Sequence, residues 1–207
     1  MSGNVVTVAQ QKGGAGKTTL VANLAVAFAK AGHSVALLDT DPQGSLGRWF
    51  MSRRERGLDD IEFSTASAWG VSYEVDKLRK QYDFVLIDTP PKIDSDLKPA
   101  LRESDLVIVP VGASQVDVWA TDGVLDLANR ENSNVLAVLN RAKPGTRVTA
   151  EVEGVVSEMG LARANTVLGN RVAYAETLGQ GLGVMERGKG AWSTEFAALA
   201  DEVKAAL

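Results

Sequence analysis

QQKGGAGKTTL, at residues 10–20, lies between an apolar run at residues 5–9 and a segment whose apolar residues recur every three or four positions. Small residues in such a loop let successive backbone N–H groups turn toward an anion, and the following helix adds the free donors of its N-terminus. We therefore expect a strand, a phosphate-binding loop and a helix in this order. The loop residues are Gly13, Gly14, Ala15 and Gly16.

The end of this stretch matches the ending GK[ST] of phosphate-binding loops. In that pattern Lys17 reaches the β and γ phosphates of a nucleotide, and the hydroxyl of Thr18 binds Mg²⁺. We assign Thr19 to the α phosphate. The full pattern G-x-x-x-x-G-K-[ST] fails at its first position, where Gln11 replaces glycine and Lys12 follows. The alternative is a glycine-rich turn without a ligand, but the strand and helix on either side favour phosphate binding.

Composition limits the class of protein. With 207 residues, 45% of them hydrophobic, the chain can bury the core of one domain, which we expect to span residues 1–207. The absence of cysteine excludes disulfides, cysteine zinc sites and iron–sulfur clusters, so a metal must be bound by oxygen ligands. The N-terminus lacks the pattern of a secretion signal, and no apolar run approaches the roughly 18 residues of a membrane span. We expect a cytoplasmic protein.

Short apolar runs alternate with longer segments of helical periodicity, which is typical of a parallel sheet covered by helices. The pattern predicts an α/β fold of the P-loop NTPase type, with a mostly parallel twisted sheet and helices on both faces. Strands are expected at residues 5–9, 35–38, 84–87, 106–111 and 135–139. Helices are expected at residues 20–31, 45–56, 73–81, 95–102, 117–130, 149–159 and 192–206.

Acidic residues follow two of the expected strands. In an open α/β sheet, ligands bind beyond the carboxyl ends of the strands, so these residues should lie near the phosphates. Asp88 follows a buried strand and is expected to bind Mg²⁺ through water. Asp41 is a candidate to orient the attacking water, with Asp39 nearer the metal. The alternatives are a cap or turn at Asp88 and an Asx turn before Pro42.

Asn140 and Arg141 follow a third expected strand. The amide of Asn140 offers a donor and an acceptor that match the Watson–Crick edge of adenine, and Arg141 can stack on or flank the base. Asn is equally common in turns, so both interpretations of this pair remain open.

KGGAGKTT, DTDPQ and VLIDTPP occur in an order and spacing that resemble the ParA/MinD family of deviant Walker ATPases, in particular the short plasmid-partition type. The resemblance implies ATP and Mg²⁺ as cofactors and a homodimer that encloses the nucleotides. It implies that Lys12 crosses to the partner subunit's phosphates, as an arginine finger does in related enzymes. It places Asp41 in switch I and Asp88 in switch II. Lys12, Lys17 and Asp41 are then the catalytic residues.

The same resemblance implies nonspecific DNA binding by the ATP-bound dimer, and association with the nucleoid. The segment GNRVAYAETLGQG resembles the corresponding stretch of the family and points to Arg171 as a phosphate contact. Because the net charge is −4, DNA binding would need a local basic patch. The family also implies a ParB-like or cargo-adaptor protein that stimulates ATP hydrolysis. Further candidate DNA contacts are Arg187 and Lys189, and more weakly Arg163 and Arg147.

Three alternatives share the nucleotide chemistry. A MinD-like ATPase that cycles on membranes should end in a basic amphipathic helix, whereas the tail EFAALADEVKAAL contains three acidic residues and one lysine. A metabolic enzyme of the same fold would need a substrate pocket that the sequence does not identify. A scaffold without turnover could dispense with Asp41. The first expected strand begins at Val5, so we expect no preceding helix-turn-helix and no operator binding.

Overall fold

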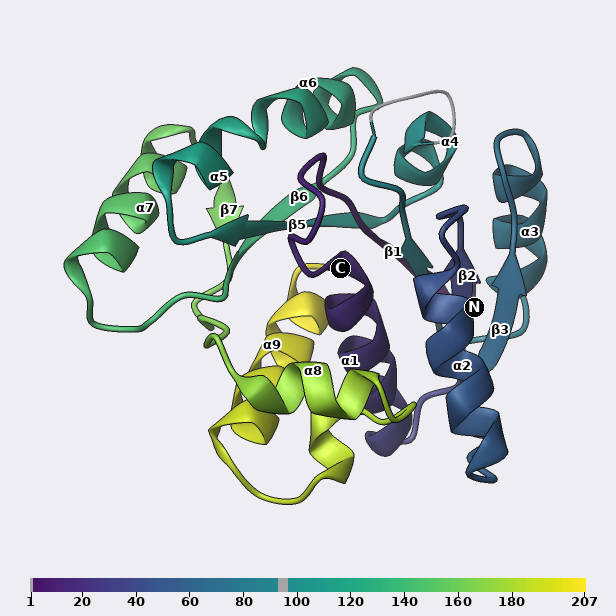
Figure 1. The fold of residues 1–207 in the computed structure, drawn as a ribbon. Coiled ribbons are helices and arrows are strands. Elements are labelled where there is room, and N and C mark those ends of the chain that lie inside the picture. The colour runs from purple at the N-terminus through teal and green to yellow at the C-terminus, as the bar shows by residue number, and fades with distance from the viewer. Residues whose placement is uncertain (1, 93–96) are drawn as a thin grey trace.

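The computed structural model describes residues 2–92 and 97–207. Their strands form one sheet in the order β3-β2-β4-β1-β5-β6-β7, and every neighbouring pair is parallel (Figure 1). The predicted fold class is confirmed. The strands are β1 (Asn4–Val8), β2 (Val35–Asp39), β3 (Glu62–Thr65), β4 (Phe84–Asp88), β5 (Leu106–Gly112), β6 (Val135–Asn140) and β7 (Ala162–Arg163).

Helices connect these strands and follow them. They are α1 (Lys17–Lys30), α2 (Ser45–Glu55), α3 (Gly70–Leu78), α4 (Leu97–Arg102), α5 (Gln115–Trp119), α6 (Asp122–Arg130), α7 (Arg147–Glu158), α8 (Val172–Leu178), the 3₁₀ helix η1 (Val184–Glu186) and α9 (Ala191–Ala205). The helix expected at residues 117–130 is instead two helices, α5 and α6. The start of the helix expected at residues 95–102 lies outside the described residues.

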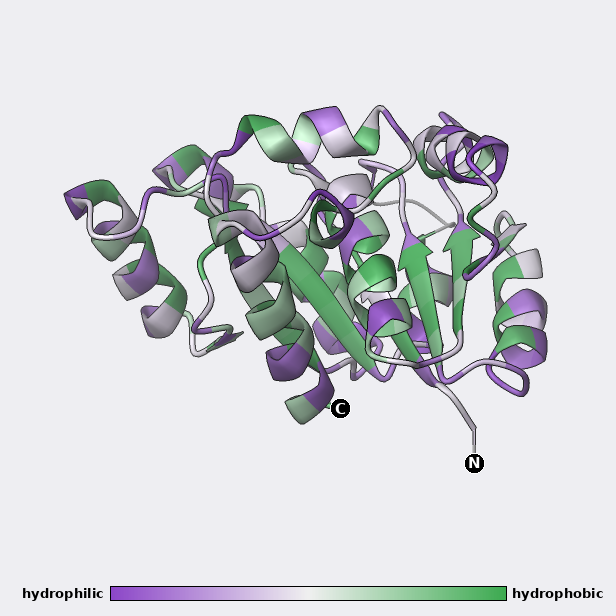
Figure 2. Cartoon of the chain, turned by 90° about the horizontal axis from the view of Figure 1, so that it is seen from below, coloured by the Kyte–Doolittle hydropathy of each residue, from purple (hydrophilic) through white to green (hydrophobic). Residues whose placement is uncertain are grey.

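Both faces of the sheet are covered. Helices α1, α2, α8 and α9 bury apolar side chains against one face, in a cluster that includes a stacked pair of rings, Phe28 and Phe84, with centroids 4.1 Å apart. Helices α3 to α7 cover the opposite face in two further clusters. The strands are the most hydrophobic part of the chain, and the helices carry their polar residues outward (Figure 2). Burial on both faces explains why the strands read as apolar runs.

A buried cation fastens α2 to the C-terminal part of the chain. Arg53 is fully buried and donates to Asp60 at 2.7 Å, to Glu186 of η1 at 2.9 Å and to the carbonyl of Gly181 at 3.3 Å. Removing one partner of a buried ion pair typically costs 3–5 kcal/mol, because the remaining charge is left without compensation. Helix α2 is therefore firmly held at its C-terminal half.

Within residues 2–92 and 97–207, no helix combines the length and the apolar character that crossing a bilayer requires.

Candidate nucleotide site

The predicted phosphate loop joins β1 to α1 at the carboxyl end of the sheet. Gly14 and Gly16 have φ values of 75° and 93°, in the left-handed region that glycine adopts without strain. A Cβ atom on Gly16 would also lie 2.5 Å from the amide nitrogen of Asn140. No side chain caps the N-terminus of α1, so its first N–H groups are available to a ligand. The loop has the geometry that phosphate binding requires.

A cleft of about 290 Å³ opens at this loop. Residues 13–19 all line this cleft. Its lining also includes Asp41, Gln43 and Arg141, of which Asp41 and Arg141 are predicted site residues. Residues that the sequence places far apart, after three different strands, therefore meet at one edge of the sheet. Thr19 lines this cleft as expected, although its specific phosphate remains a prediction.

Asp88 lies beneath the loop and is 1% exposed. The hydroxyl of Thr18 donates to its Oδ2 at 2.6 Å, whereas its buried Oδ1 has no hydrogen-bond partner within residues 2–92 and 97–207. Burial raises the pKa of this carboxyl to about 7, with Asp39 and Asp41 adding to the rise and Thr18 and Lys17 opposing it. A buried oxygen without a partner, beside a hydroxyl, fits a hard cation such as Mg²⁺.

The protein offers only part of a cation's ligand shell. Among the residues that the structure describes, no three acidic or histidine side chains gather into a metal site. Mg²⁺ usually keeps several waters and is bound by one or two protein oxygens together with substrate phosphates. Thr18 and Asp88 are therefore the residues that would hold Mg²⁺ here, with the remaining ligands supplied by the nucleotide and by water.

Asp39, expected near the metal, makes a different set of contacts. Its Oδ1 accepts from the N–H of Asp41 at 3.0 Å, and its Oδ2 accepts from the N–H of Gly47 at 3.1 Å. Burial raises the pKa of Asp39, while these backbone bonds oppose the rise. Both oxygens thus fix the turn between β2 and α2. Its role as a metal ligand stays a prediction, because a metal would have to displace these bonds.

Asp41 lies in that turn and faces the cleft. Its Oδ1 accepts from the N–H of Gln43 at 2.9 Å, which is the Asx turn considered from the sequence. The same residue lines the cleft with the phosphate loop. The turn and the water-orienting role are compatible, because a carboxylate has a second oxygen to offer.

Lys17 is the first residue of α1 and is 7% exposed. Burial lowers the pKa of its ammonium group, whereas the charges of Asp88 and Asp41 raise it. The positive charge of Lys17 is balanced by two nearby carboxylates, and the phosphates of a nucleotide can take over part of this role. The position suits the predicted role.

Asn140 supports the phosphate loop from behind. Its side-chain N–H donates to the carbonyl of Ala15 at 2.8 Å, and its Oδ1 accepts from the N–H of Arg141 at 3.0 Å. The residue is 6% exposed. The amide thus uses both ends on the backbone, and the predicted bond to a base would require these contacts to be exchanged. Arg141 has a φ of 54° and lines the cleft, where a base could lie against it.

Lys12 directly precedes the residues that line the cleft and is not itself one of them. Its ammonium group forms an ion pair with Asp117 of α5, and 42% of its side chain is exposed. Burial acts to raise the pKa of Asp117, but the hydrogen bonds from Lys12 and Ser114 hold it below the ordinary value. Asp117 packs so close to Gly112 that a Cβ there would lie 2.5 Å from its Oδ2. Sequence reasoning missed Asp117, since nothing in its local pattern marks it as a partner of the loop.

Most candidate DNA contacts form ion pairs within the chain. Arg171 pairs with Glu195 of α9, which also accepts from Tyr174, and the side-chain hydrogen bond to Glu195 raises the pKa of Arg171. A DNA phosphate would compete with these carboxylates, and the DNA contacts stay predictions. The remaining pairs are Arg187 with Glu176, Arg163 with Glu153 at 3.7 Å and Arg147 with Glu151 at 2.7 Å, while Lys189 is exposed.

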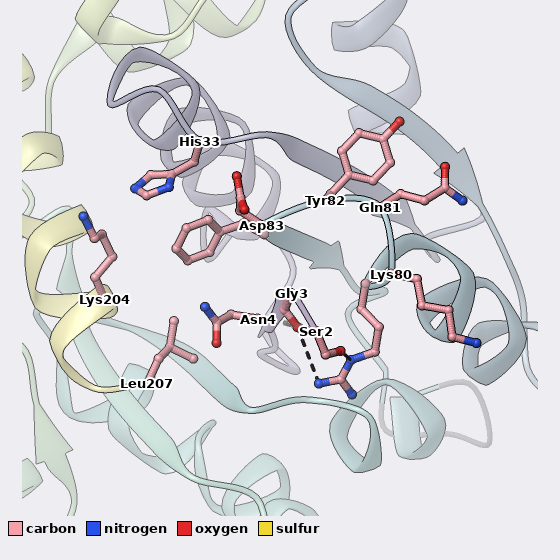
Figure 3. Close-up of a pocket in the computed structure, with 12 residues that line it drawn as sticks. Ser2, Gly3, Asn4, His33, Lys80, Gln81, Tyr82, Asp83, Lys204 and Leu207 are labelled. Carbon is pink, nitrogen blue, oxygen red and sulfur yellow. Dashed lines mark hydrogen bonds between the residues drawn. The ribbon is translucent and has the colours of Figure 1, made fainter.

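A larger hollow of about 480 Å³ lies at the opposite end of the strands (Figure 3). His33, Asp83 and Lys204 are among its lining residues, and no predicted site residue lines it. The nucleotide site is thus marked by its chemistry, not by its size.

Residues 6–183 match the CobQ/CobB/MinD/ParA nucleotide binding domain. The chain belongs to this family. The predicted resemblance to ParA and MinD is thereby confirmed, and with it nucleotide binding as the property of the family. That the nucleotide binds in the cleft at the phosphate loop stays a prediction.

The relatives that the chain resembles are named for different processes. The chain is 27% identical over 189 residues to the maintenance of carboxysome distribution protein A of Halothiobacillus neapolitanus, covering 88% of this chain and 87% of that protein. It is 30% identical over 181 residues to the chromosome-partitioning ATPase Soj of Thermus thermophilus, covering 74% and 68%. A plasmid partition protein of Borrelia burgdorferi, solved with AMPPNP, shares the fold with a TM-score of 0.80 and 18% identity, covering 99% and 100%.

Proposed function

We propose that this chain, as a single domain over residues 1–207, is a partition or positioning ATPase. Two ATP-bound copies would form a dimer that encloses the nucleotides and binds DNA without sequence preference. Hydrolysis, stimulated by a cargo-adaptor protein, would separate the dimer and release the DNA. The relatives that maintain carboxysome distribution and partition chromosomes support this class of function.

The position of Lys12 carries the proposal. A lysine that served its own nucleotide would line the cleft, as Lys17 does, but Lys12 lies at the surface beside the loop and pairs with Asp117. From there it can reach the phosphates of a second copy once that copy is close. A cation supplied by the second subunit can be worth about 10³–10⁵ in rate, because it adds charge stabilisation only in the assembled site.

Within one subunit the residues divide the work. The loop N–H groups and Lys17 would bind the β and γ phosphates, and Thr18 and Asp88 would hold Mg²⁺, which neutralises phosphate charge when bound. Asp41 orients the attacking water, with its turn fixed by Asp39. Asn140 keeps the loop in place through the carbonyl of Ala15.

The test compares ATP, ADP and a nonhydrolysable ATP analogue. We expect a dimer by light scattering and retention of nonspecific DNA with ATP or the analogue, but not with ADP, and DNA retention should fall steeply with salt. The product of the neighbouring reading frame, tested as a candidate adaptor, should then raise ATP turnover. A monomer that binds no DNA in any nucleotide state would refute the proposal.

A parallel measurement addresses the alternative of membrane cycling. Co-sedimentation with anionic vesicles in ATP, in place of DNA retention, would indicate a MinD-like regulator. The acidic residues of α9 lead us to expect no such binding, because anionic lipid attracts basic helices.

A further inference from the structure

Strand β3 is an edge of the sheet. Among the described residues it has one neighbouring strand, β2, with Leu37 opposite Phe63 and Asp39 opposite Thr65. Helix α2 covers the sheet on one face beside this edge and α3 on the other (Figure 1). An edge strand presents backbone donors and acceptors to which an extended segment of another protein can pair.

The backbone alternation of β3 shows which groups face outward. The N–H of Ala66 donates to the carbonyl of Asp39 on β2 at 3.3 Å. Alternation along the strand then turns the N–H groups of Phe63 and Thr65 away from β2. The N–H of Phe63 donates instead to the carboxylate of Glu62 at 3.1 Å, a local bond that an incoming strand can replace.

A groove of about 600 Å³ lies on the α2 side of this edge. Its floor is apolar, with Phe63, which stacks on Phe50, and Met51, which is 59% exposed. Its other end is formed by the turn that contains Asp39 and Asp41, and in the part of the chain that the structure describes these two aspartates are its only charged lining residues. The groove is therefore apolar at one end and acidic at the other.

A second hollow, of about 220 Å³, lies on the α3 side of the same strand. It is polar: the hydroxyl of Ser64 donates to Glu74 at 2.8 Å, and the hydroxyl of Tyr82 donates to Glu62 at 3.3 Å. Side chains of a strand alternate between faces, so a segment paired to β3 would place every second side chain in each hollow.

We propose that β3 is the docking strand for an extended segment of the stimulating adaptor. The segment would carry an apolar residue and a lysine or arginine two positions apart. The apolar side chain would pack on Met51 and Phe63, and the cation would lie beside Asp41, with the residue between them in the polar hollow. This inference rests on the proposed function, and it names the chemistry and the place of the partner. Because the groove includes the turn that contains Asp41, docking there acts directly on the residue that orients water.

The experiment uses the full chain with ATP and the candidate adaptor from the neighbouring reading frame, both whole and as short overlapping peptides. We expect one peptide with the apolar and basic pair to bind. Met51→Lys should weaken this binding about ten-fold or more, because it removes apolar contact and repels the cation. Val148→Lys, at an exposed apolar residue of α7 away from the groove, is the matched control and should leave binding unchanged.

A second pair of variants tests backbone pairing. Thr65→Pro removes the outward N–H of β3, which edge strands tolerate, whereas Thr65→Val keeps it. Only the proline variant should lose peptide binding and adaptor-stimulated turnover, while both retain basal ATP turnover. Equal effects of the two Thr65 variants, or full stimulation of Met51→Lys, would overturn the docking site.

Failure of the docking proposal is distinguishable from failure of the proposed function. If the wild-type chain retains DNA with ATP and is stimulated, but the variants respond as it does, the function stands and the docking strand is wrong. If the wild-type chain neither retains DNA nor responds to the adaptor, both are wrong.

Discussion

Asp88→Asn should change how the stability of the nucleotide-free protein depends on pH. The pKa of Asp88 is raised from 3.8 to about 7, so the folded state holds a proton that the unfolded state releases. For a carboxyl with a raised pKa, this stabilising contribution is complete below the unfolded value and is lost as pH rises to about 7. In that window the free energy of unfolding changes by up to about 1.4 kcal/mol per pH unit, and by half of that at pH 7, where the folded carboxyl is half ionised. Wild type should therefore lose about 2.3 kcal/mol between pH 5 and pH 7.

The asparagine variant should lack this part of the slope, because its amide does not titrate. Urea unfolding in chelator at several pH values gives both slopes, and their difference cancels groups common to the two proteins, such as Asp39. The absolute stability of the variant is not diagnostic, since its amide N–H is itself buried. With Mg²⁺ and ATP the wild-type slope should flatten, because the bound cation favours the charged carboxylate. Parallel slopes in chelator would refute the burial argument.

Four further outcomes are expected. Lys12→Ala should impair ATP-dependent dimerisation or stimulated turnover; light scattering and an ATPase assay that both match wild type would count against its role across the dimer. Asp41→Ala should give an ATP-bound dimer that keeps DNA, and normal phosphate release in that variant would remove it as the residue that orients water. Gly16→Ala should lose nucleotide binding in calorimetry, because its φ of 93° is strained for alanine and the new Cβ lacks space. Arg171→Gln should weaken DNA retention while Glu195→Gln strengthens it, since the latter frees the cation; a gel shift that neither variant alters would exclude Arg171 from the DNA surface.

Much of the fold could be predicted from sequence because its central strands are buried on both faces. Their apolar runs are continuous. Because the strands are parallel, the residues that follow them lie at the same edge of the sheet. The edge strands β3 and β7 escaped prediction because that signal fails there: β3 is Glu-Phe-Ser-Thr, half exposed, and β7 has two residues. Helix α8 could not be predicted because it is short. The break between α5 and α6 could not be predicted because residues 120 and 121 are neither proline nor glycine, the residues that usually mark a helix end.

The site divides in the same way. The position of the phosphate loop between β1 and α1, with Thr18 beside Asp88, could be predicted because the loop follows a strand and Asp88 ends one. The ligands of these residues stay predictions. The contacts of Asp39 and Asn140 could not be predicted, because a carboxylate or an amide near a ligand can bind the ligand or brace the backbone, and only the local geometry distinguishes the two. The ion pair between Asp117 and Lys12 could not be predicted either, because it depends on how α5 packs beside the loop, and no sequence pattern marks that contact.

The buried Arg53 restrains helix α2 at its C-terminal half. Helix α2 follows the turn that contains Asp41. The ion pairs of Arg53 with Asp60 and Glu186 hold the C-terminal half of this helix in position. The turn itself is held by the two backbone hydrogen bonds that Asp39 accepts, which are weaker restraints than buried ion pairs, and it ends at Gly44 with a φ of 62°. We therefore expect that exchange of ATP for ADP changes the conformation of this turn, and that the C-terminal helices keep their positions on the sheet.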